Sequence, residues 1–306
     1  MHILMIFLDG IGLGADDPAH NPFAAADLPT LHMLSGGQRW LANSQQHMGD
    51  RALFIPTDPR LGVPGRPQSG SNQATIVTGR NIPQHIGQHY GPKPNQATRD
   101  LLDADNLFKR LINAGKSAAI LEAYPPRWHK GINSGKHIPA SYQYAARSAG
   151  LRFFGKDDLY AGDALSGDWT GQGWREVLHF DDAPLHTPYA AGQHLAELAQ
   201  RYDFTFFPHW LTDTTGHRGT LSDGVNLLTT VDRVMAGLLA AWDDQNGLVI
   251  ITSDHGNLED MSHGKHTEND VPTIVIGEQK ALFADLTDLT GFVPRILHLL
   301  EVPFER

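Results

Sequence analysis

The stretch GLVIITSDHGN, residues 247–257, joins an apolar run directly to side chains of the kind that bind metals. Residues 248–251 are uninterruptedly apolar and Thr252 is β-branched, which is typical of a strand buried on both faces. A carboxylate and an imidazole, Asp254 and His255, follow almost at once, and Gly256 comes next. The sequence therefore predicts a buried strand whose carboxyl end presents two ligand-type side chains.

Apolar runs alternate with helical patterns along most of the chain. Further strands are expected at 2–9, 116–124, 203–210 and 271–277. Helices are expected at 28–34, 71–79, 103–115, 192–202, 223–244 and 290–300. Such alternation indicates a largely parallel sheet covered by helices on both faces. We expect an α/β fold, a three-layer α/β/α sandwich.

The middle of the chain has a different composition. Residues 125–190 are rich in glycine, proline, aromatic and charged residues, as in YPPRWHKGINSGKHIP. This composition predicts a small cap inserted into a core that is formed by residues 1–124 and 191–306.

Composition excludes several classes of partner. The 306 residues carry a net charge of −10, which argues against nucleic acid or an anionic membrane as the main partner. No cysteine is present, so disulfides and thiolate metal ligands are excluded. The N-terminal run lacks a basic region and reaches Asp9 too early for a signal peptide. No apolar run approaches the roughly 18 residues that span a bilayer. We expect a cytoplasmic protein that does not enter a membrane.

Three of the expected strands each lead to an aspartate: Asp9, Asp213 and Asp254. Ligands of open α/β sheets bind beyond the carboxyl ends of the strands, so these side chains are expected to meet. Three neighbouring carboxylates repel one another unless a cation lies between them. A single aspartate of this kind is more often a turn or N-cap residue, but three together favour a metal site.

Histidines accompany these aspartates. His217 follows Asp213 by four residues, across what reads as a short turn containing glycine, and His255 adjoins Asp254. His266 lies in a polar loop before a strand, with His263 as a competing candidate. Carboxylate and imidazole ligands without thiolates suit Zn²⁺ or Mn²⁺. The residues suffice for two ions, and two ions about 3.5–4 Å apart can clamp a phosphoryl group.

A Gly/Pro-rich loop, GVPGRPQSGSNQATIVTGRN (62–81), leads into a helix through Ser69 and Ser71. The N-terminus of a helix favours anions, and a serine there that contacts a metal can attack phosphorus. Either serine can instead simply cap the helix, and the residues alone leave this open.

These motifs together resemble the alkaline phosphatase superfamily, in particular its cofactor-independent phosphoglycerate mutase and phosphopentomutase branch. The segments FLDGIGLG, SGSNQATIVTGR, DTTGH, SDHGN and HTENDVP are similar to that branch's motifs and stand in the same order, within residues 1–90 and 200–306. The resemblance implies an alkaline phosphatase-like fold and two divalent ions, Mn²⁺ or Zn²⁺. Anchored on Gly79 and Arg80, it places the nucleophile at Ser69. It implies one ion at Asp9, Ser69, Asp254 and His255, and another at Asp213, His217 and His266.

The chain departs from the mutases in two respects. Residues Gly70-Ser71-Asn72-Gln73 stand where the mutases carry Glu-Val-Gly-His, and the long cap insert of the mutases is missing. A short cap puts in doubt the enclosure that returns a phosphoryl group to its own substrate. Our main hypothesis is therefore a phosphomonoesterase acting on a small phosphorylated metabolite through a phosphoserine intermediate.

A phosphomutase is the alternative hypothesis. Further alternatives are a phosphodiesterase, a phosphonate hydrolase or a non-catalytic metal-binding relative. The cations proposed to bind substrate are Arg80, His89, Arg127 and Lys130, although each also fits a solvated basic loop.

Overall fold

The strand β1 (His2–Leu8) lies inside the sheet, with a neighbouring strand on each side. All of its residues after His2 are apolar and buried. It pairs in parallel with β5 (Phe204–His209) on one side and with β6 (Gly247–Thr252) on the other. A strand with helices over both faces needs apolar side chains in both directions, which explains the uninterrupted run. The three strands that lead to aspartates are therefore neighbours.

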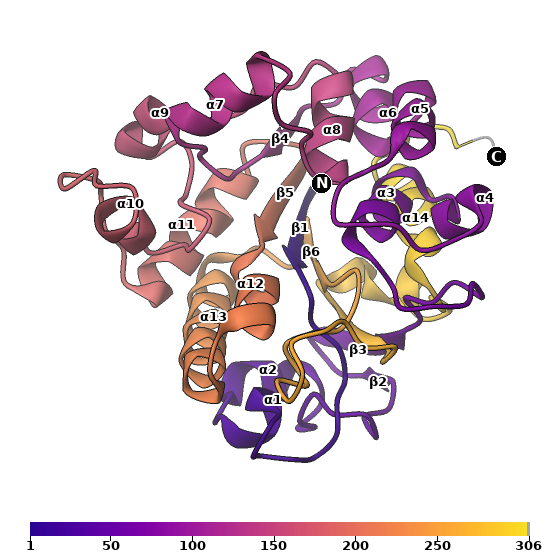
Figure 1. Cartoon of the computed structure of the whole chain (residues 1–306), viewed down its shortest axis with the longest axis vertical. Coiled ribbons are helices and arrows are strands. Elements are labelled where there is room, and N and C mark those ends of the chain that lie inside the picture. The colour runs from indigo at the N-terminus through magenta and orange to yellow at the C-terminus, as the bar shows by residue number, and fades with distance from the viewer. Residues whose placement is uncertain (305–306) are drawn as a thin grey trace.

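The computed structural model describes residues 1–304 and shows one mixed sheet between layers of helices (Figure 1). The remaining strands are β2 (His47–Met48), β3 (Ala52–Thr57), β4 (Ala118–Ile120) and β7 (Val271–Ile276). Within these described residues, the seven strands have the order β2-β3-β7-β6-β1-β5-β4. β4 continues the parallel part beside β5, whereas β7 is antiparallel to β6 and β3 is antiparallel to β7. The expected fold class is confirmed.

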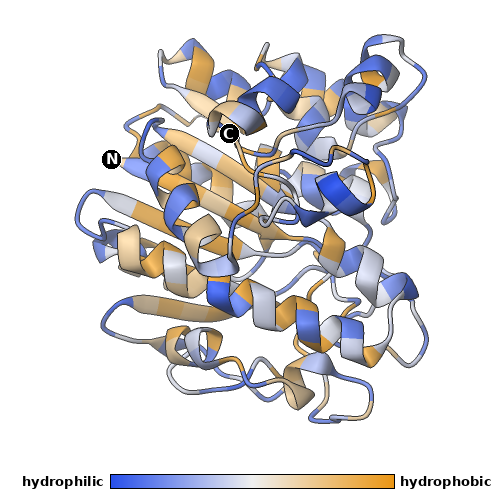
Figure 2. Cartoon of the chain, turned by 90° about the vertical axis from the view of Figure 1, so that its left-hand side faces the viewer, coloured by the Kyte–Doolittle hydropathy of each residue, from blue (hydrophilic) through white to orange (hydrophobic). Residues whose placement is uncertain are grey.

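Alternate residues of the central strands face two separate cores. Leu4 and Ile6 pack into one core, and Ile3 and Met5 into the other. The first face is covered by α1 (Pro22–Ala25), α2 (Pro29–Leu34), α11 (Pro188–Ala199) and α13 (Leu221–Ala241). The second is covered by α3 (Ser69–Thr78), α4 (Ile82–Ile86), α5 (Gln96–Ala104), α6 (Leu107–Asn113), α8 (Ser141–Ser148) and α14 (Phe292–Leu299). Figure 2 shows strands that are mainly apolar beneath helices of mixed polarity.

Two local expectations were wrong. The single helix expected at 103–115 is divided into α5 and α6, because Asn106 caps α6 by accepting a hydrogen bond from the Lys109 N–H. The strand β3 was not expected at all. Its sequence, ALFIPT, contains Pro56, which lacks the N–H of a regular strand residue. β2 pairs only with Leu53 and Phe54, so Pro56 is tolerated beyond the end of that neighbour.

The segment 125–190 contacts both faces of the sheet. On the second face it forms α7 (Pro126–Asn133) and α8, where the Ser141 hydroxyl donates to the Gly70 carbonyl at 2.6 Å. It continues as α9 (Lys156–Ala161) and α10 (Gln172–Glu176), and Trp174 packs into the core of the first face. The division into core and cap stays a prediction. No helix in the described part of the chain is both long and apolar enough to cross a membrane.

Candidate metal centre

Two buried carboxyl groups meet where β1 and β6 end. Asp9 directly follows β1, and Asp254 follows β6 by two residues. Among residues 1–304, neither Asp9 Oδ1 nor Asp254 Oδ2 has a hydrogen-bond partner, although both atoms are buried. Burial and the negative charge of Asp213 raise the pKa of Asp254 to about 7. Burial and the charge of Asp254 raise the pKa of Asp9 well above its usual range. Two partnerless acid oxygens in one buried site fit a cation.

His255 faces both of these acids. Its Nε2 lies 3.5 Å from Asp9 Oδ1 and 3.6 Å from Asp254 Oδ2. The same nitrogen lies 2.9 Å from the hydroxyl oxygen of Ser69, the first residue of α3. The four side chains that the resemblance assigns to one ion are therefore brought together. Asp213 also joins this group, because Asp9, Asp213 and His255 each offer a ligand atom within 4.8 Å of the others.

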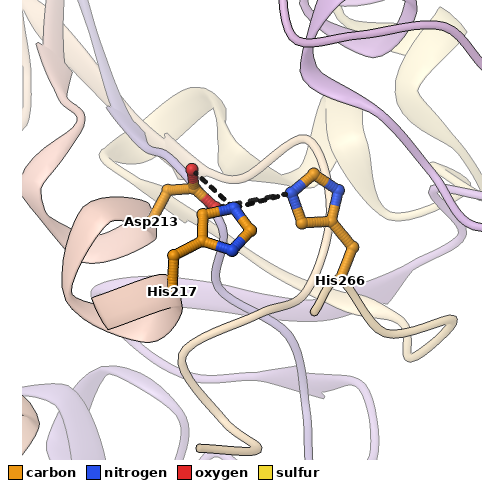
Figure 3. Close-up of side chains that lie close together, drawn as sticks. All are labelled: Asp213, His217 and His266. Carbon is orange, nitrogen blue, oxygen red and sulfur yellow. Dashed lines mark hydrogen bonds and ion pairs between the residues drawn. The ribbon is translucent and has the colours of Figure 1, made fainter. Parts of the chain in front are cut away.

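The second group of ligand-type residues begins on α12 (Leu211–Arg218). Asp213 and His217 lie one turn apart on this helix, so the expected turn between them is wrong. His217 Nε2 is 3.3 Å from Asp213 Oδ2, and His266 Nε2 is 3.6 Å from Asp213 Oδ1. Figure 3 shows His266 reaching toward the α12 pair from the loop that precedes β7. These three residues also offer ligand atoms within 4.8 Å of one another.

The orientation of the histidines favours metal binding. The Nδ1 of His217 lies 2.8 Å from the Gly264 carbonyl, and the Nδ1 of His266 lies 2.9 Å from the Pro67 carbonyl. A carbonyl only accepts, so each Nδ1 carries a proton, and in the neutral imidazole each Nε2 presents a lone pair. The two Nε2 atoms are 3.2 Å apart. Two facing lone pairs repel unless a shared cation lies between them, and backbone-anchored imidazoles are the usual arrangement in metal sites.

The protonation states of Asp213 and His266 are compatible with metal binding. Burial opposes the ionisation of Asp213, but hydrogen bonds from His217 and Asn257 outweigh it and hold the Asp213 pKa below its usual range. Burial and the nearby His255 lower the pKa of His266 to about 4, so its imidazole is neutral at pH 7. The contact with Asp213 raises the pKa of His217, so a divalent ion bound here would take the place of a proton on that imidazole.

Sequence analysis missed two residues that support the site. Asn257 donates from its side chain to Asp213 Oδ1 at 2.7 Å. Glu259, which is 1% exposed, accepts from the Gly12 N–H at 2.9 Å and the Asn257 N–H at 2.7 Å. Glu259 also accepts from the Asn269 side chain at 3.0 Å and from the Thr267 hydroxyl. It thereby connects the loops that carry Asp9, His255 and His266. Asn257 is the last residue of SDHGN and Glu259 follows it by two residues, but nothing in their spacing indicates this role.

A cavity of about 620 Å³ opens beside the two groups and is lined by Asp9, Ser69 and Asp213 among others. Of the four proposed substrate-binding cations, Arg127 lines it, whereas Arg80, His89 and Lys130 do not. Arg80 instead pairs with Asp105 at 3.4 Å, and His89 contacts the Arg60 carbonyl at 3.1 Å. Lys93, which was not singled out from the sequence, also lines the cavity.

The two candidate serines differ in their surroundings. Ser69 faces His255 and the cavity. Ser71 is fully buried; its hydroxyl donates to the Gln68 carbonyl at 3.2 Å and accepts from the Tyr90 N–H at 3.1 Å. The expectation that Ser71 caps the first N–H groups of its own helix is therefore wrong, because it instead fastens the loop at Tyr90 to the start of α3.

Part of the chain matches a known family and known proteins. Residues 175–302 match the model of the Metalloenzyme superfamily. A 2,3-bisphosphoglycerate-independent phosphoglycerate mutase from Methylobacillus flagellatus is 32% identical over 135 residues, which are 41% of this chain and 26% of that protein. The corresponding enzyme from Pyropia yezoensis is 38% identical over 109 residues, which are 30% of this chain and 20% of that protein. The matched part thus spans about a quarter of these curated relatives.

Solved structures share the fold over nearly the whole chain. Alkaline phosphatase from the Antarctic bacterium TAB5 superposes with a TM-score of 0.55 at 14% identity, covering 98% of each chain. Phosphoglycerate mutase from Leishmania mexicana gives 0.52 at 13% identity, covering 100% of this chain and 96% of the other. Sequence and fold agree with the resemblance expected from the motifs: residues 175–302 match the Metalloenzyme superfamily, and the chain has an alkaline phosphatase-like fold.

Proposed function

We propose that the protein transfers the phosphoryl group of a small phosphomonoester through Ser69, with two divalent ions held by the residues described above. The observation that carries this proposal is the position of the Ser69 hydroxyl, which stands 2.9 Å from His255 Nε2 in the wall of the cavity beside both ligand groups. One ion would be held by Asp9, Ser69, Asp254 and His255, and the other by Asp213, His217 and His266. Mn²⁺ and Zn²⁺ both suit these oxygen and nitrogen donors.

The chemistry divides between the ions and the chain. Divalent ions, when bound, would favour ionisation of the Ser69 hydroxyl and neutralise charge on the phosphoryl oxygens. The Ser69 oxygen attacks phosphorus, the bond from phosphorus to the alcohol oxygen breaks, and the departing alkoxide takes up a proton. Lys93 and Arg127 line the cavity and supply positive charge for the phosphate or for another anionic group of the substrate. The product of this half-reaction is phosphoserine at position 69.

The fate of that phosphoserine separates a mutase from a phosphatase. The phosphomonoesterase was our main hypothesis, but the curated relatives named above are mutases, and they support the alternative better. We therefore infer a phosphomutase: a second hydroxyl of the same alcohol attacks the phosphorus and releases the Ser69 oxygen. Attack by water in its place would release inorganic phosphate.

The test compares two serine variants of the metal-loaded protein. Ser69→Ala is expected to abolish phosphoryl transfer, reducing it by orders of magnitude, and to leave the fold intact. Ser71→Ala removes the contact with Tyr90 and is expected to cost about 1–3 kcal/mol of stability while it retains much of the activity. Phosphorylated sugars and acids are incubated with each protein, and isomer formation and free phosphate are both measured.

Peptide mapping of a trapped intermediate completes this test. A phosphoryl group on Ser71, or full activity in Ser69→Ala, would contradict the assignment of Ser69. If one free phosphate is released for each substrate consumed and no isomer forms, the protein is a phosphomonoesterase and not a mutase.

A further inference from the structure

One buried acid in the cavity takes no part in the metal groups. Glu122 follows β4, and its backbone is held on both sides: the Leu121 N–H donates to the Phe206 carbonyl at 3.0 Å and the Ala123 N–H to the Leu165 carbonyl at 2.8 Å. Leu121 and Ala123 pack into the core of the first face. Because side chains alternate along an extended chain, Glu122 points to the opposite face, where the cavity lies.

The carboxyl group of Glu122 is only half satisfied. The residue is 4% exposed, and its Oε1 accepts a hydrogen bond from Trp210 Nε1 at 2.9 Å. Its Oε2 is buried and lies outside hydrogen-bonding geometry with any partner in residues 1–304, as does the hydroxyl of Tyr124, which interacts with Glu122 strongly enough to affect the pKa of both groups. The Gly167 backbone packs so closely that a Cβ there would lie 2.5 Å from Oε1, which restricts movement of the carboxyl group. A buried polar atom without a partner is costly, so a structural role toward Trp210 alone does not explain this oxygen.

The surroundings of Glu122 suit the carbon skeleton of a polar ligand. Aromatic side chains line the same cavity of about 620 Å³, namely Tyr124, Trp128, Tyr142 and Trp210. The rings of Tyr124 and Trp128 stack with centroids 4.1 Å apart, so they form a flat apolar surface. A ligand whose phosphate lies at Ser69 would extend along these aromatic side chains, where Glu122 is available to bind a polar group.

Charge decides which polar group that is. Lys93 and Arg127 line the same cavity, and their positive charge disfavours a cationic alcohol such as an amino alcohol. Burial raises the pKa of Glu122 to about 7, against smaller opposing effects of Tyr124 and Trp210. Near neutral pH the carboxyl group can therefore either donate or accept a hydrogen bond. A hydroxyl group is the neutral partner that satisfies either form.

We propose that Glu122 is a specificity-determining residue that binds a hydroxyl group on the alcohol part of the substrate, which makes the substrates hydroxylated phosphomonoesters such as polyol or sugar phosphates. This inference rests on the proposed function, because it requires the phosphate of the same molecule to lie at Ser69. The mutase reaction already requires a hydroxyl group on the alcohol; this inference adds the residue that would bind such a group, which the metal groups do not supply.

Binding of two matched esters tests the proposal without turnover. Glycerol 3-phosphate and propyl phosphate, which lacks the hydroxyl groups, are titrated calorimetrically into Mn²⁺-loaded Ser69→Ala protein. With Glu122 intact, glycerol 3-phosphate is expected to bind about tenfold more tightly or better, as one well-placed hydrogen bond to a carboxyl group allows. In a Glu122→Leu background this preference is expected to fall to about one.

A second variant and a control make the result decisive. Glu122→Gln keeps an acceptor for Trp210 and is expected to give an intermediate preference for glycerol 3-phosphate. This variant replaces Glu122→Leu in the test if Glu122→Leu fails to fold. Asp232→Asn changes another buried carboxyl group, which accepts from the Leu31 N–H at 2.8 Å outside the cavity, and is expected to keep the full preference. Equal affinity of the two esters with Glu122 intact, a preference that stays undiminished in Glu122→Gln or persists in Glu122→Leu, or no binding of either ester would overturn the proposal.

Turnover by protein with Ser69 intact separates the two ideas. If a preference that depends on Glu122 exists but no ester phosphorylates Ser69, the proposed function fails and the binding role stands. If phosphoryl transfer occurs and the Glu122 variants affect both esters equally, the proposed function stands and the role of Glu122 is refuted.

Discussion

Replacing Glu259 by glutamine should weaken the fold considerably, although the two side chains have nearly the same shape. The carboxylate accepts four hydrogen bonds, from Gly12, Asn257, Thr267 and Asn269. A glutamine offers one oxygen and one NH₂ group, so at least one donor must face another donor. Hydrogen bonds to a charged group contribute about 1.5–3 kcal/mol each, whereas neutral ones contribute about 1 kcal/mol. Loss of the charge and of one bond together predicts a decrease of about 3 kcal/mol in the free energy of unfolding.

Urea denaturation of chelator-treated protein measures this effect without any contribution from bound ions. The matched control is Glu268→Gln, because Glu268 lies in the same loop but is exposed, and its variant should unfold within about 0.5 kcal/mol of the unchanged protein. Metal affinity of Glu259→Gln should fall as well, since the loops bearing Asp9, His255 and His266 lose their common anchor. A decrease below about 1 kcal/mol in Glu259→Gln would refute the reasoning.

Three further predictions concern the ions, pH and helix packing. Metal-loaded protein should contain two divalent ions per chain by elemental analysis. Asp254→Ala or His266→Ala should lose one or both of these ions. Unchanged protein that retains no ion after loading would refute the ligand assignment. Glu122 titrates near 4.5 when unfolded and near 7 when folded, so the folded state holds its proton longer and stability is lost as pH rises from about 4.5 through 7. Urea titrations at each pH give the free energy of unfolding of the metal-free protein and of Glu122→Gln. The difference between the two should decrease by up to about 3 kcal/mol as pH rises across that window, and a constant difference would contradict the raised pKa. A Cβ at Gly237 in α13 would lie 1.9 Å from the Tyr189 carbonyl of α11, so Gly237→Ala should cost about 1–3 kcal/mol despite its better helix propensity, and an unchanged thermal midpoint would speak against such close packing.

Much of the fold followed from apolar runs, because a strand covered on both faces must be apolar throughout. β1, β5 and β6 were predicted for this reason, as was the meeting of Asp9, Asp213 and Asp254 at one edge. The strand β3 escaped prediction because its proline interrupts the usual pattern, and only the short neighbour β2 makes Pro56 acceptable there.

The details of the site were less accessible to sequence reasoning. The segment TDTTGHR contains threonines and a glycine, which are weak helix formers, so α12 looked like a turn. Glu259 is identified by its hydrogen bonds, which include one from the distant Gly12, and Glu122 by its place in the lining of the cavity. Such contacts leave no periodic signal, and three-dimensional structure is needed to distinguish these buried acids from the many exposed ones.

The position of β1 also constrains how the protein folds. Ile3 lies between Phe204 on β5 and Leu248 on β6, so β1 pairs only with strands that are made much later. Contacts this distant along the chain carry a large loop-closure cost and are associated with slow folding. Until β5 and β6 arrive, an apolar strand with both edges unpaired is open to aggregation or to a chaperone. Asp9 therefore meets Asp213 and Asp254 only after β5 and β6 have been made, and we expect the candidate metal centre to assemble late in the folding of this sheet.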